Sequence, residues 1–101
     1  MKKILLVCGS GASSGFIAQN MRKAAKAKGL DVTIKAVSDT QIEDYVDEID
    51  LLMIGPHLKH RLAEIEESVK SYKIKAMLID QQSYASLDGA SVLEAALKEL
   101  D

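Results

Sequence analysis

The only cysteine of the chain, Cys8, stands where a nucleophile that receives a phosphoryl group is expected. The apolar run before it, residues 4–7, predicts a buried strand, and residues 9–15 after it are small and rich in glycine and serine. Residues 16–28 then predict a helix. Free backbone amides and the positive end of a helix dipole stabilise a thiolate and hold a phosphate. The pattern therefore predicts phosphate chemistry on Cys8.

The predicted phosphate-binding segment consists of the seven residues that follow the cysteine, namely Gly9, Ser10, Gly11, Ala12, Ser13, Ser14 and Gly15. Its glycines lack a Cβ, so an anion can approach the backbone closely. Ser13 and Ser14 are also candidate N-caps of the following helix. Capping and phosphate binding are compatible because both use the same helix terminus.

His57 is the second candidate site residue, because it follows the apolar run 51–54 and the stop signal Gly55-Pro56. Two interpretations stay open for it, a phosphate contact and a surface residue at a helix start. For the neighbouring basic cluster Lys59-His60-Arg61 the sequence favours a solvated helix face. One cysteine and two histidines lack the spacing of a zinc site, so we expect no metal and no cofactor.

Length and composition set the class of protein. At 101 residues and 48% hydrophobic content, we expect a single domain over residues 1–101. A net charge of −2 argues against a nucleic-acid partner. One cysteine forms no internal disulfide, and neither a signal peptide nor a membrane-spanning run is recognised. We therefore expect a cytoplasmic, monomeric protein with a reduced thiol.

Apolar runs alternate with helical patterns along the chain, which indicates an α/β fold. Runs 4–7 and 51–54 are continuously apolar and should be central strands, whereas residues 32–36 alternate like an edge strand and 76–79 predict a fourth strand. Helices are expected over 16–28, 40–46 and 58–69, and after an Asp88 N-cap. Thr40 and Glu43 are spaced as a capping box, and Gly29 fits the residue after the first helix.

These elements predict a three-layer sandwich with a parallel sheet of order 2-1-3-4, a short flavodoxin-like arrangement. The strand order reverses between the first and third strands. Ligands of such sheets bind at the carboxyl ends beside that point. The loops there are residues 8–15 and 55–60, so topology and composition indicate the same site.

A cysteine followed after five residues by arginine would suggest a low-molecular-weight tyrosine phosphatase or an arsenate reductase. Ser14 occupies the arginine position, so the bidentate clamp on a phosphate dianion is missing. No Asp-Pro pair is present to supply a general acid. The arrangement of strand, loop and helix is kept, but the residues argue against hydrolysis.

The chain resembles the IIB component of the bacterial sugar phosphotransferase system (PTS), in its lactose/cellobiose (N,N′-diacetylchitobiose) family. The motifs run in order through nearly the whole chain; they are KILLVC at 3–8, GASS at 11–14, DLLMIGP at 50–56, Ile79-Asp80, Tyr84 and LDGA at 87–90. Two positions depart from the family: Ala12 replaces a frequent methionine and His57 a frequent glutamine.

The resemblance implies a phosphocarrier. Members of the family receive a phosphoryl group on the loop cysteine from a histidine of the IIA protein. They pass it to a sugar bound by the IIC permease at the inner face of the membrane. Carried over to this chain, the acceptor is Cys8 and the sugar is expected to be cellobiose or another β-glucoside. The alternatives left open are a phosphatase-like enzyme and a non-catalytic phosphate-binding module.

Overall fold

The computed structural model describes residues 2–8 and 12–100, and its centre is a four-stranded parallel sheet. The strands are β1 (Lys2–Cys8), β2 (Val32–Ser38), β3 (Leu51–Ile54) and β4 (Lys75–Leu78). They follow the order β2-β1-β3-β4, and every neighbouring pair is parallel. The predicted strand order is confirmed, with β1 and β3 in the centre.

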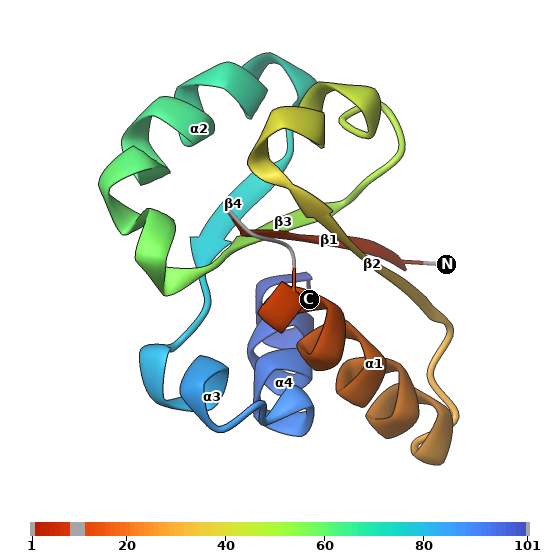
Figure 1. Ribbon diagram of the computed structural model, residues 1–101. Coiled ribbons are helices and arrows are strands. Elements are labelled where there is room, and N and C mark those ends of the chain that lie inside the picture. The colour runs from red at the N-terminus through yellow and green to blue at the C-terminus, as the bar shows by residue number, and fades with distance from the viewer. Residues whose placement is uncertain (1, 9–11, 101) are drawn as a thin grey trace.

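Helices cover both faces of the sheet and complete a three-layer α/β sandwich (Figure 1). One face carries α1 (Ala12–Ala27), α3 (Gln81–Ala85) and α4 (Gly89–Leu100). The other carries α2 (Leu62–Val69) and the 3-10 helices η1 (Asp39–Asp44), η2 (Pro56–Arg61) and η3 (Lys70–Tyr72).

The sheet separates two apolar cores, because side chains of each strand point alternately to opposite faces. In the centre of the sheet, Leu6 and Met53 pack with α1 and α4, whereas Leu5 and Leu52 pack with α2 and the 3-10 segments. All four of these side chains are at most 1% exposed. This explains why β1 and β3 read as continuous apolar runs.

The first helix begins earlier than the sequence pattern suggested. α1 starts at Ala12 rather than residue 16, so Ser13 and Ser14 lie inside its first turn and neither is the N-cap. At the other end, Gly29 has a φ of +67°, as predicted. The Leu30 N–H donates to the Ala25 carbonyl oxygen at 2.9 Å, which closes a Schellman motif.

The predicted helix over residues 40–46 is instead the 3-10 helix η1, which starts at Asp39. The Gln41 side chain accepts a hydrogen bond from the Ser38 N–H at 3.2 Å, so the reciprocal spacing involves Ser38 and Gln41, not Thr40 and Glu43. The Thr40 hydroxyl lies 2.8 Å from that of Ser38. Because η1 follows β2 without an intervening residue, the cap falls on the last residue of the strand.

Two further differences lie in the second half of the chain. The helix expected over residues 58–69 is divided into η2 and α2, with non-helical backbone at Leu58 (φ −105°, ψ 15°). The short helix α3 was not predicted. It is capped by Asp80, whose carboxylate accepts a hydrogen bond from the Ser83 N–H at 3.1 Å.

Candidate functional site

Cys8 is the last residue of β1, and the ends of two neighbouring strands flank it. Its backbone is in register with Ser38, the last residue of β2. On the other side, Val7 pairs with Ile54 of β3, and the Gly55 N–H donates to the Val7 carbonyl oxygen at 2.8 Å. Cys8 therefore lies at the point where the strand order reverses, as the sequence predicted.

The predicted phosphate-binding segment is divided by the start of α1. Gly9, Ser10 and Gly11 lie outside the described residues. Residues 12–15 form the first turn of α1. The N–H groups of a first helical turn have no acceptor within the helix, and they carry the positive end of its dipole. The backbone of this turn can therefore bind an anion.

His57 lies in η2, just after β3, and its side chain is exposed. The centre of its ring is 5.7 Å from that of Tyr84 in α3, with the ring planes tilted by 50°. Both residues line a hollow of about 340 Å³, together with Pro56, Lys59, Gln81 and Ala85. Tyr84 was named only among the family motifs and not as a site residue, because only the fold brings α3 beside η2.

The basic cluster after His57 divides into two environments. Lys59 and His60 are exposed, as a solvated helix face requires. Arg61 is different, because its guanidinium hydrogen-bonds the Asp39 carboxylate and lies 3.4 Å from a Glu64 carboxylate oxygen. Its side chain is 32% exposed. The prediction of a solvated face is therefore wrong for Arg61.

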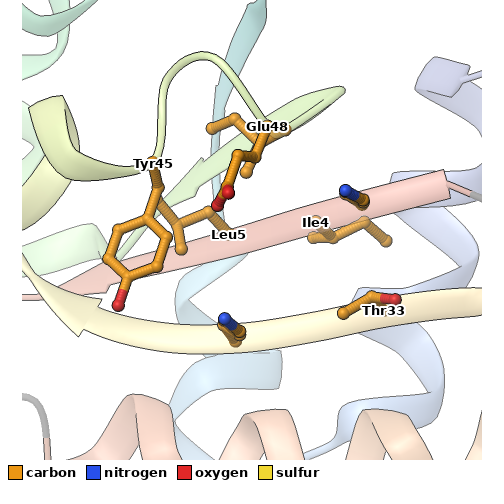
Figure 2. A pocket seen from close by; sticks show the side chains of 8 residues that line it. Ile4, Leu5, Thr33, Tyr45 and Glu48 are labelled. Carbon is orange, nitrogen blue, oxygen red and sulfur yellow. The ribbon is translucent and has the colours of Figure 1, made fainter.

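A second hollow, of about 170 Å³, lies on the α2 side of the sheet (Figure 2). Tyr45 and Glu48, from the segment that leads into β3, line this hollow together with Leu5 of β1 and Thr33 of β2. The Lys35 ammonium is 5.2 Å from the centre of the Tyr45 ring, which suits a cation–π contact. The lining residues that belong to β1 and β2 all precede the carboxyl ends of these strands. This hollow is therefore separate from the edge of the sheet that carries Cys8.

Within residues 2–8 and 12–100, no three His, Cys, Asp or Glu side chains are grouped so that they could hold a metal ion. The same residues contain no helix with the length and apolar character needed to cross a membrane.

The sheet order and its two helical layers define the class of protein, a small parallel α/β protein of the kind that includes a low-molecular-weight phosphatase. A YwlE mutant from Bacillus subtilis superposes with a TM-score of 0.66 at 15% identity, over 99% of both chains. YwlE is an arginine phosphatase. At this identity the likeness concerns the fold alone, and it confirms the predicted fold class.

The family follows from the sequence. Residues 3–98 match the model of the PTS system, lactose/cellobiose-specific IIB subunit. The chain belongs to this family and is a phosphotransferase component of that system, as the resemblance implied.

Relatives of this chain differ in the sugar for which they are named. An oligo-β-mannoside-specific EIIB component of Bacillus subtilis is 32% identical over 96% of this chain and 94% of its own length. The structure of a cellobiose-specific IIB protein from Borrelia burgdorferi is 32% identical with a TM-score of 0.79, over 96% and 89% of the chains. A lactose-specific IIB domain from Streptococcus pneumoniae reaches a TM-score of 0.89 at 17% identity, over 99% and 98%.

Proposed function

We propose that Cys8 carries the phosphoryl group between a IIA protein and a sugar bound by a IIC permease. The Cys8 thiolate attacks phosphorus of a IIA phosphohistidine, so an S–P bond forms while the N–P bond breaks. A sugar hydroxyl then attacks the phosphocysteine, an O–P bond replaces the S–P bond, and the hydroxyl proton leaves to a base or to water. The place of Cys8 at the carboxyl end of β1, directly before the segment that leads into α1, supports this role.

The first turn of α1 supplies the electrostatic part of the proposal. Phosphoryl transfer needs positioning and charge stabilisation more than covalent chemistry from the protein. The amides of Ala12, Ser13 and Ser14 suit that task because they occupy the positive end of a helix of 16 residues. The remaining predicted ligands, Gly9, Ser10, Gly11 and Gly15, stay part of the proposed site.

The absence of an arginine at position 14 suits a carrier better than a phosphatase. A carrier must hold phosphate without transferring it to water, so a weaker clamp is an advantage. The rival function is phosphatase activity, which the YwlE-like fold allows. Release of nitrophenol from p-nitrophenyl phosphate measures it, and we expect little turnover.

His57 is proposed as an additional phosphate contact. It lies two residues beyond Gly55, whose N–H donates to the strand that ends in Cys8. A His57→Ala variant should retain phosphorylation but slow it, whereas the exposed His60 offers a matched control in the same segment.

The proposed sugar is a β-linked disaccharide, with cellobiose or another β-glucoside as the first choice. Relatives named for cellobiose and for oligo-β-mannosides support a β-linked substrate. Uptake assays with cellobiose, lactose and a β-mannoside in cells that supply the matching IIA and IIC proteins distinguish these sugars.

The deciding experiment uses phosphorylated IIA protein as donor. Wild-type chain should acquire one phosphate that is labile to iodine, and Cys8→Ala should acquire none. His60→Ala serves as the control and should be labelled as fast as wild type. Labelling of Cys8→Ala to the wild-type level would exclude the proposed role of Cys8.

A further inference from the structure

Two 3-10 segments flank the carboxyl end of β1 on the α2 side of the sheet. η1 follows Ser38 directly, and Ser38 is in register with Cys8. A single residue, Gly55, separates β3 from η2, and its N–H donates to the Val7 carbonyl oxygen. The two strands that neighbour β1 therefore lead into η1 and η2 close to Cys8.

One side chain connects these two segments. The Arg61 guanidinium, at the end of η2, donates from Nη1 to the Asp39 carboxylate, at the start of η1. Its Nη2 lies 3.4 Å from Oε1 of Glu64 in α2. The side chains of Arg61 and Asp39 are 32% and 19% exposed, so water screens this pair less than it screens a fully exposed one.

The surroundings of the pair favour one arrangement of the two segments. Ile42 of η1 and Leu58 of η2 are 6% and 8% exposed and belong to the same apolar cluster. Glu43 and Glu64 line the hollow that contains Asp39 and Arg61. A guanidinium donates in a fixed planar fork, so it fixes the direction of its carboxylate partners as well as their distance.

We propose that the Arg61–Asp39 pair positions the site. The pair fixes the turns after β2 and β3, and it thereby fixes the ends of the two strands that neighbour Cys8. The proposal rests on the function proposed for Cys8 and adds a residue to it. Arg61 acts through the backbone of its neighbours and is not proposed to contact phosphate.

The sharpest test measures the pKa of the Cys8 thiol from thiolate absorbance and from the pH dependence of alkylation, on the chain alone. Simple charge effects have opposite signs: Arg61→Met removes a cation and would raise this pKa, whereas Asp39→Asn removes an anion and would lower it. Loss of the pair releases the same two turns beside the end of β1 in both variants, and under the proposal each variant then stabilises the Cys8 thiolate less well. We therefore expect both substitutions to raise the pKa of Cys8.

A matched control comes from the other face of the sheet. Arg22 of α1 donates from Nε to the Ile34 carbonyl oxygen at 2.8 Å, so it also links two elements, away from the η1–η2 connection. Arg22→Met should change the free energy of unfolding without changing the pKa of Cys8. Arg61→Lys keeps the charge but loses the fork, and its pKa should lie between wild type and Arg61→Met.

The second measurement is the rate of phosphoryl transfer from IIA. A misplacement of 1 Å can slow a reaction by about 10²-fold, so we expect about a tenfold loss from the looser constraint in Arg61→Met. The double variant should be no slower than the worse single variant, because both remove one contact. Opposite pKa shifts, or no shift in either variant, would overturn the positioning role even if Cys8 still accepts phosphate. Failure of wild type to accept phosphate would refute the proposed function instead.

Discussion

The two faces of the sheet are covered in different ways. On one face α1 and α4, of 16 and 12 residues, pack against each other and against the strands. On the other, three short 3-10 helices surround α2, which has only eight residues. The face of long helices serves as scaffold and presents the first turn of α1. The other face, called the broken face below because η1, η2, α2 and η3 cover it, supplies the turns that follow the strands beside Cys8.

Close approach of α4 to α1 strengthens the scaffold face. A Cβ on Gly89 would lie 2.5 Å from the Cβ of Asn20, which no unstrained structure allows. The Asn20 amide also donates to the Leu87 carbonyl oxygen at 2.8 Å, just before α4. The segment leading into α4 and the backbone of α1 are therefore fixed to each other over a short distance.

The largest expected effect is a cavity in the scaffold face. Leu93 of α4 is fully buried, whereas Leu58 of η2 is 8% exposed. Leu93→Ala should lower the free energy of unfolding by about 4 kcal/mol and Leu58→Ala by about 2 kcal/mol, because the broken face relaxes more easily around the missing atoms. Urea unfolding measures both. Equal losses would show that the two faces are equally rigid.

The second effect is overpacking between α1 and α4. Gly89→Ala should lower the free energy of unfolding by about 2 kcal/mol, because its Cβ forces the two helices apart. The matched substitution is Gly15→Ala in α1, where nothing lies within 4 Å of the new Cβ. An unchanged unfolding midpoint for Gly89→Ala would contradict the close approach of the two helices.

The third effect depends on pH. Hydrogen bonds from the Ser91 side chain, and then from its backbone N–H, lower the pKa of Asp88 below its usual 3.8. A lowered folded-state pKa means that Asp88 stabilises the fold above pH 3.8, and that this contribution is lost as the pH falls through the folded pKa. The difference in free energy of unfolding between wild type and Asp88→Asn should therefore be constant above pH 4 and shrink as the pH falls below 4. A constant difference down to pH 2 would contradict this.

The smallest effect is an increase in stability. Gly15→Ala should raise the free energy of unfolding by about 0.5–1 kcal/mol, because alanine favours the helix and meets open space. Gly29→Ala should do the reverse by about 1 kcal/mol, since its φ of +67° suits glycine. The midpoints of thermal unfolding of these two variants, compared with wild type, show how much each end of α1 contributes to the stability of the fold.

The scaffold face was easier to predict than the broken face, for physical reasons. Continuous apolar runs mark β1 and β3 because both are buried on two sides, and together with the alternating pattern of β2 they predicted the strand order. The start of α1 was missed because Ser13, Ser14 and Gly15 are poor helix formers taken alone. η1 and η2 were read as α-helices because apolar spacing does not distinguish them from 3-10 helices.

The candidate site divides in the same way. The place of Cys8 follows from local sequence, since a strand end and a run of small residues are adjacent along the chain. The contact of His57 with Tyr84, and that of Arg61 with Asp39 across 22 residues, depend on how separate turns meet in the fold. Residue types alone carry no signal for such pairs.

The link between Arg22 and the Ile34 carbonyl oxygen also affects how molecules meet each other. β2 is an edge strand, and the backbone of an exposed edge can pair with a strand of a second molecule. A second chain that added a strand there would have to displace a guanidinium from Ile34 and approach the exposed Lys35. Charge at this edge therefore opposes aggregation by strand addition.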